Sequence, residues 1–253
     1  MSETLPATTQ PGVPAKWAER FTKIAESQRK HEKTSGQFFS IKAGQLTFGG
    51  NPIAGNKMDV VVLESMHERV YYPDKYGTTD NTSPVCYAFS ATGEDMAPHP
   101  ESTKPQNATC KGCPHDKWGS SDNGKGKACK EGRRLSLISA SELTSPSKVG
   151  DGVVGYLRIP VTSVRNFSTY VQGVVGGSSL PLFCFVTRVS VVPDPKTQVK
   201  VTFERVAAID NDEVMDAVFN RATAEAENIS FPYPRPNNEE AQPQKATKRS
   251  GKF

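Results

Sequence analysis

Alternating apolar and polar residues run through the middle of the chain and predict β-strands. The segments "QFFSIKAGQLTFGG" and "KMDVVVLESMHERVYY" are rich in Phe, Val, Ile and Tyr, and "GGNPIAGN" separates them. Similar patterns return in "RRLSLISA", "GVVGYLRIP", "PLFCFVTRVSVV" and "VKVTFERVAAI", and the last two are joined by "PDPKTQ". The chain is therefore expected to be mainly β.

Three other segments repeat apolar residues at helical spacing. Trp17, Phe21 and Ile24 lie between Pro14 and Gly36, which predicts a helix over 15–35. "SVRNFSTYVQGVV" predicts a second helix with Ser163 as its N-cap. "NDEVMDAVFNRATAEAEN" has an Asn/Asp cap and acidic first-turn residues, which predicts a C-terminal helix over 213–230.

The order of these segments is strand, strand, long insertion, one or two strands, helix, strand, strand, helix. A helix between the third and fourth strands is typical of the five-stranded OB barrel, whose strand face and loops bind oligonucleotides. The predicted fold is thus mainly β with α: an OB-like barrel over 36–212, a Cys-rich insertion at about 77–132, and flanking helices. A mixed α+β sheet is the competing architecture. The end segments 1–14 and 231–253 are predicted to be disordered.

Composition is that of a globular protein on the polar side, with 36% hydrophobic and 23% charged residues. No run approaches the roughly 20 apolar residues of a membrane span, and the N-terminus lacks the charged and apolar regions of a secretory signal. We therefore expect a cytoplasmic protein without membrane contact. In a reducing cytoplasm, clustered cysteines are more often metal ligands than disulfides.

Four of the five cysteines lie in the insertion, at Cys86, Cys110, Cys113 and Cys129. Their spacing is C-x23-C-x2-C-x15-C. A C-x2-C pair on a tight turn suits two vertices of a tetrahedron, and the insertion has few apolar residues to order it. These features predict one structural Zn2+ ion with four Cys ligands. A Cys3His site with His99 or His115, and an iron–sulfur cluster, remain alternatives.

Positive charge is concentrated in two regions of a chain whose net charge is only +4. Residues 104–134 hold eight basic and three acidic residues, and residues 235–253 hold five basic and two acidic ones. Such regions on a near-neutral body indicate a polyanionic partner. Single-stranded nucleic acid also needs aromatic rings on which bases stack, and Trp118 in its polar loop is the best candidate. The candidate nucleic-acid contacts are Arg69, Tyr72, Lys75, Tyr76, Lys111, Lys117, Trp118, Lys125, Lys127, Lys130, Arg133, Arg134 and Arg165.

The strand segments and the cysteine insertion together resemble bacteriophage single-stranded DNA-binding proteins. The similarity rests on "FFSIKAGQLTFGG", "VVVLESMHERVYYPDKY", the C-x2-CP motif with "WGS" and "GKGKACK", and "LRIPVTSVRNFSTYV". It implies an OB fold with an inserted zinc module, and a non-enzymatic protein that coats single-stranded DNA (ssDNA) in phage replication and recombination. Members commonly end in an acidic tail that recruits replication partners. The tail here is basic, so it is expected to bind DNA or an acidic replication or recombination protein.

Two rival functions remain open at this stage. One is a structural or transcription-associated zinc protein that binds duplex DNA or protein. The other is a metal- or Fe–S-dependent nuclease. No H-E-x-x-H, G-x-S-x-G or paired-carboxylate signature is present, so an enzyme is not expected. The residues do not distinguish DNA from RNA.

Overall fold

The computed structural model describes residues 38–73 and 83–234 of the 253-residue chain. Several predictions fall outside the described residues: the disordered N-terminus 1–14, the helix over 15–35, the candidate contacts Lys75 and Tyr76, and the tail from residue 235.

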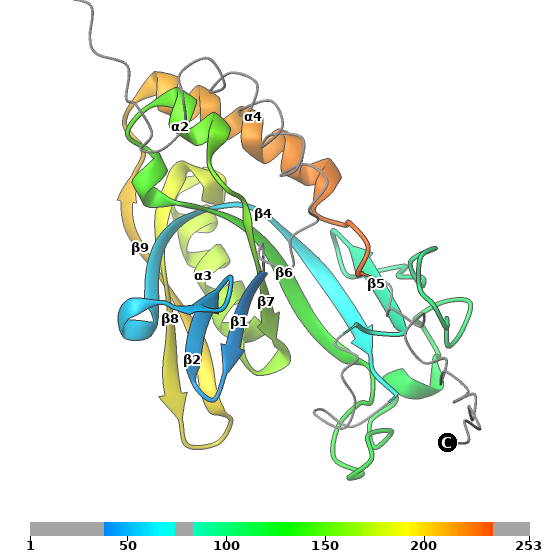
Figure 1. Ribbon diagram of the computed structural model, residues 1–253. Coiled ribbons are helices and arrows are strands. Elements are labelled where there is room, and N and C mark those ends of the chain that lie inside the picture. The colour runs from blue at the N-terminus through cyan, green and yellow to red at the C-terminus, as the bar shows by residue number, and fades with distance from the viewer. Residues whose placement is uncertain (1–37, 74–82, 235–253) are drawn as a thin grey trace, which may run out of the picture.

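The strands form one curled, mixed, nine-stranded sheet (Figure 1). Its order is β3-β2-β1-β7-β6-β4-β8-β9, and β5 pairs with β4 beside this path. β1 runs parallel to β7, whereas the other neighbouring strands of the described residues run antiparallel. The strands are β1 (Phe38–Lys42), β2 (Gln45–Phe48), β3 (Asn51–Pro52), β4 (Lys57–Tyr71), β5 (Cys86–Ser90), β6 (Lys130–Ser139), β7 (Gly155–Pro160), β8 (Phe185–Asp194) and β9 (Gln198–Ala208).

Helices cover both faces of the sheet because its central strands are apolar on both faces. Val60 and Val62 of β4 pack in one core with Phe167 of α3 (Val161–Ser178). Val61 points the other way and packs in a second core with Val218 of α4 (Asp212–Asn228), beside the short helix α2 (Pro146–Asp151). Side chains alternate between faces along a strand, so the run of valines in β4 supplies both cores. We call the two sides the α3 face and the α4 face.

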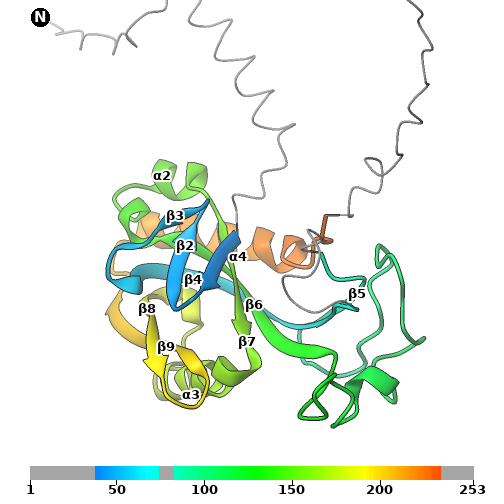
Figure 2. The ribbon, with the colours of Figure 1, turned by 60° about the horizontal axis from the view of Figure 1, so that its bottom comes forward.

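The strands β4 and β6 extend beyond the two cores as an antiparallel arm (Figure 2). Their register runs from Val60 opposite Ser139 to Val70 opposite Lys130, with a bulge between Val62 and Glu64. β8 pairs with the first part of β4, and β5 pairs with its last five residues. The segment 83–129 folds around the tip of the arm, and we call it the lobe.

The coarse prediction of a mainly β protein with a few helices is confirmed. α3 lies between β7 and β8, and α4 follows β9, as the order of segments predicts. The N-cap prediction for α4 is also confirmed, since the side chain of Asn211 accepts a hydrogen bond from the Val214 N–H. The sheet has nine strands where five were predicted. Among the described residues, no helix is both long and apolar enough to cross a membrane.

The prediction that Ser163 caps α3 is wrong. The helix starts earlier, after Pro160, and Ser163 is buried within it. Its Oγ accepts a hydrogen bond from the Val201 N–H, and the Asn166 side chain donates to the Val201 carbonyl (both 2.9 Å). Ser163 and Asn166 therefore satisfy backbone groups at the edge of β9, which would otherwise be open to pairing with another strand.

Candidate nucleic-acid interface

The lobe is ordered by hydrogen bonds and ring contacts that the sequence does not reveal. Backbone N–H groups of Lys104, Cys110 and Cys129 donate to carbonyls elsewhere in the lobe at 2.8–2.9 Å. His115 stacks on Tyr71 of the arm, with ring centroids 4.1 Å apart. His99 stacks on another strand residue, Tyr87, at 5.1 Å. His115 thus fixes the lobe to β4, and His99 packs the later part of the lobe against its own strand β5.

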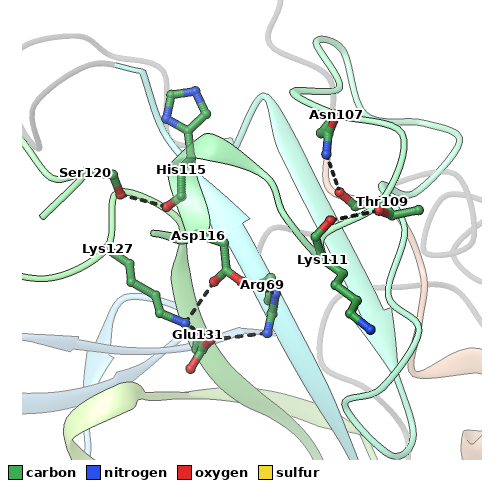
Figure 3. Close-up of polar contacts among 9 residues, drawn as sticks. All are labelled: Arg69, Asn107, Thr109, Lys111, His115, Asp116, Ser120, Lys127 and Glu131. Atoms are coloured by element: carbon green, nitrogen blue, oxygen red, sulfur yellow. Dashed lines mark hydrogen bonds and ion pairs between the residues drawn. The ribbon is translucent and has the colours of Figure 1, made fainter. Parts of the chain in front are cut away.

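An ion-pair network joins the lobe to the α3 face of the arm (Figure 3). Arg69 contacts Asp116 at 3.0 Å and Glu131 at 3.2 Å. Lys127 contacts the same two carboxylates at 2.9 and 2.7 Å. Hydrogen bonds to Glu131 and Asp116 raise the pKa of Lys127 against the opposing effect of burial. Two cations and two anions leave this cluster neutral overall.

The four insertion cysteines line one small cavity of about 20 Å³ beneath the lobe, together with Arg69, Tyr71 and other residues. Burial raises the pKa of Cys86, Cys110 and Cys129, the last to about 12, and so favours the neutral thiols.

The prediction of a structural zinc ion is wrong. Within the described residues, no group of three or more His, Cys, Asp or Glu side chains could hold a metal ion. The finding applies equally to the Cys3His alternative, since His99 and His115 are among the described residues. The prediction assumed that the lobe had nothing else to order it. That premise fails, because the ion-pair network, the ring stacks and the backbone hydrogen bonds hold it.

Trp118 lies on a hydrogen-bonded loop of the lobe, and 80% of its surface is exposed. The N–H groups of Gly119 and Ser121 donate to the Gly126 carbonyl at 2.8 and 3.3 Å, and the Ser121 hydroxyl donates to the Lys125 carbonyl at 3.0 Å. Gly119 has φ +87°, a left-handed conformation that glycine adopts without strain, so the chain turns directly after the tryptophan. The loop therefore presents the indole from an ordered backbone.

Four described lysines of the candidate set remain exposed on the lobe and arm: Lys111, Lys117, Lys125 and Lys130. Their ammonium groups form no ion pair with the described residues, although Lys130 Nζ donates to the Lys127 carbonyl at 2.6 Å. The adjacent acidic residues Asp116 and Glu131 are already shared by Arg69 and Lys127. Asp122 is the other carboxylate of the Trp118 loop and is exposed, so the lysines leave a net positive charge on this part of the surface.

Arg134 is fully buried on the α4 face, and we remove it from the candidate contacts. Its guanidinium bonds Glu68 at 2.7 Å and donates to the Phe231 carbonyl at 2.9 Å. The rings of Phe89, Phe231 and Tyr233 lie 4.3–4.9 Å from its guanidinium carbon. An arginine enclosed in this way cannot reach a ligand.

The other candidate contacts divide into paired and exposed groups. Arg69 and Lys127 are committed to the ion-pair network and are mostly covered, whereas Tyr72 is 38% exposed at the end of β4 and Arg165 is exposed on α3. Arg133 is half-buried on the α3 face and pairs in register with His67. Sequence reasoning missed Glu68, His67 and Tyr233. Glu68 and His67 are adjacent on β4, so their side chains point to opposite faces of the sheet. Only the β4–β6 register identifies the neighbours of each.

Comparison with known proteins adds no assignment: no family model matches the chain, and neither the curated proteins nor the solved structures contain a significant match.

Proposed function

We propose that this protein binds single-stranded DNA without catalysing a reaction, through base stacking on Trp118 and phosphate contacts from the exposed lysines around it. The observation that carries the proposal is the 80% exposed indole on an ordered, lysine-bearing loop. An exposed indole offers an unpaired base a large stacking surface, and an ordered loop loses little conformational entropy when it binds.

The charges around this loop support a nucleic-acid partner. Lys117 adjoins Trp118, and Lys125 lies on the opposite side of the hydrogen-bonded loop. The ion-pair network neutralises the carboxylates between the loop and the arm. An approaching phosphate backbone thus meets cations that need not first break an ion pair.

The aromatic contact favours single strands over duplex DNA. Charge alone cannot prefer single strands, since duplex DNA has the denser phosphate array, whereas an unpaired base can stack on an indole. The same proposal includes three expectations that agree with the resemblance to phage ssDNA-binding proteins. The sheet is OB-like, and the protein is located in the cytoplasm of a phage-infected host. The basic tail contacts DNA or an acidic replication or recombination protein.

The test uses the full chain with Trp17→Phe, so that Trp118 is the single tryptophan. Binding of an oligothymidylate should quench its fluorescence. Trp118→Ala should weaken ssDNA binding by roughly 5- to 150-fold, the equivalent of one lost base stack, and should leave weak duplex binding unchanged. Tyr72→Ala is the matched test of the second exposed aromatic residue.

Equal affinity for single-stranded and duplex DNA in the parent, with no effect of Trp118→Ala, would instead favour a charge-driven duplex binder. Cleavage of the oligonucleotide that depends on divalent cations would favour a nuclease. Either result would refute the proposal.

A further inference from the structure

Arg133 is a half-buried cation without a counter-ion in the described part of the chain. Its Nε atom is buried and has no hydrogen-bond partner there. The nearest carboxylate along its strand, Glu131, already contacts Arg69 and Lys127. Burial alone lowers the pKa of Arg133, and no carboxylate offsets this effect. A guanidinium in this setting gains from any anion that reaches it.

The strand register places Arg133 at the border between the α3 core and the lobe. It lies between His67 of β4 and Ile159 of β7, and directly opposed residues of a sheet share a face. Its guanidinium carbon is 6.0 Å from the centroid of the Phe167 ring of α3. The first turn of α3, on the same face, contains no acidic residue. Ile159 and Phe167 beside Arg133 are apolar, and the nearest carboxylate, Glu131, is already paired with Arg69 and Lys127.

His67 is the titratable partner in this row. Burial lowers its pKa, as do the charges of Arg133 and Arg69, while Glu131 has the opposite, smaller effect. The neighbouring strand β5 presents uncharged Ser90 opposite His67. The loop after β5 covers the ring so closely that a Cβ on Gly93 would lie 2.8 Å from its Nδ1, and the acidic residues of that loop, Glu94 and Asp95, are exposed.

We propose that Arg133 and His67 form a phosphate subsite on the α3 face of the arm, which binds one phosphodiester group of the single strand and couples its binding to protonation of His67. This inference rests on the proposed function. It differs from the lysine contacts of the lobe because the bound phosphate would change the protonation state of a half-buried histidine.

The direction of the coupling follows from the charges. In the free protein, burial and the neighbouring arginines lower the pKa of His67 and so favour its neutral form. A phosphate beside Arg133 supplies the missing negative charge and raises the pKa of His67. The additional ssDNA affinity is fully present below the pKa of His67 in the free protein and is lost as pH rises through its pKa in the complex. Between these two pKa values, binding takes up as much as about one proton.

The experiment follows the imidazole signals of the full chain by NMR, with His67→Gln to assign His67, and measures oligothymidylate affinity between about pH 5 and 8. The pKa of His67 should rise when ssDNA binds, and His67→Gln should remove the pH dependence of binding. Arg133→Met keeps the aliphatic packing and should weaken ssDNA binding by roughly tenfold. It should also raise the pKa of His67 in the free protein. Arg133→Lys should restore most of the affinity, and His99→Gln is the matched control.

Two results would overturn the subsite while leaving the proposed function intact. One is an unchanged His67 pKa in a complex whose Trp118 fluorescence is quenched. The other is a folded Arg133→Met variant with parental affinity and pH dependence. If no ssDNA binds at all, the proposed function fails first, and the subsite fails with it.

Discussion

Replacing Arg134 tests whether a basic residue of the candidate set stabilises the fold instead of contacting DNA. Arg134→Met keeps much of the side-chain volume against the surrounding rings but removes the guanidinium. The variant loses the ion pair with Glu68 and the hydrogen bonds to the carbonyls of Ile229 (3.1 Å) and Phe231 (2.9 Å). The ion pair and the hydrogen bond to Ile229 are buried, and the hydrogen bond to Phe231 is partly buried.

The size of the effect follows from these contacts. Glu68 would not be left alone, because Arg158 contacts it at 2.7 Å and the Tyr233 hydroxyl donates to it at 2.8 Å. The two carbonyls, however, would lose a charged donor. A buried carbonyl left without a donor costs about 1–3 kcal/mol, so the two carbonyls together with the lost ion pair are expected to cost about 3–5 kcal/mol. This is a large part of the roughly 5–15 kcal/mol by which a domain is usually stable. Arg134→Lys keeps the charge without the planar fork, and its loss should be smaller.

Urea unfolding followed by circular dichroism measures the stability, and fluorescence anisotropy at low temperature measures ssDNA affinity of the folded variant. We expect Arg134→Met to lose about 3–5 kcal/mol of unfolding free energy and to keep parental affinity. The control is exposed Arg165→Met, which should change stability by less than about 0.5 kcal/mol. A stable Arg134→Met protein that no longer binds ssDNA would show that the guanidinium reaches the ligand, and would refute the reasoning.

Two further predictions follow from the ion pairs and the buried acid. Lys125→Gln should reduce the log–log slope of ssDNA affinity against salt concentration by about 0.7 without a change in stability. Lys127→Gln should chiefly reduce stability, because the charge of Lys127 is paired with Asp116 and Glu131. Equal behaviour of the two variants would contradict this division. The Glu225 Oε2 accepts a hydrogen bond from Tyr156 at 3.1 Å, and burial raises the pKa of this carboxyl group. The protonated carboxyl group therefore stabilises the fold, fully below about pH 4.5, and this stabilisation is lost as pH rises through the raised pKa. Glu225→Gln should therefore be more stable than the parent at neutral pH but not in acid, as urea midpoints across pH would report, and a parent that gains on the variant as pH rises would contradict it.

The sequence by itself determined the type and order of most secondary-structure elements. Periodicity is a local property, so the strand pattern around Val60 and the helical patterns that became α3 and α4 were readable from neighbouring residues. The exposure of Trp118 was also predictable, because its polar, glycine-rich neighbours cannot bury an indole. The short strands β3 and β5 and helix α2 were missed, β5 inside the predicted insertion, because segments this short carry little periodic signal.

Only the tertiary structure decided which charged residues are available to a ligand. Arg133 and Arg134 are adjacent in sequence and point to opposite faces of β6, yet what covers each face is set by α3 and by the segment after α4. The segment after α4 was predicted to be disordered from residue 231, but Phe231 and Tyr233 pack around Arg134. The guanidinium of Arg134, which is distant in sequence, and the rings around it supply interactions that the segment lacks locally. Lys125 and Lys127 are two residues apart, and their difference arises from Asp116 and Glu131, which the fold of the lobe brings to Lys127. Composition revealed where positive charge is concentrated, whereas long-range pairing determined how much of it is free, because a charge is neutralised by its neighbours in space and not by those in sequence.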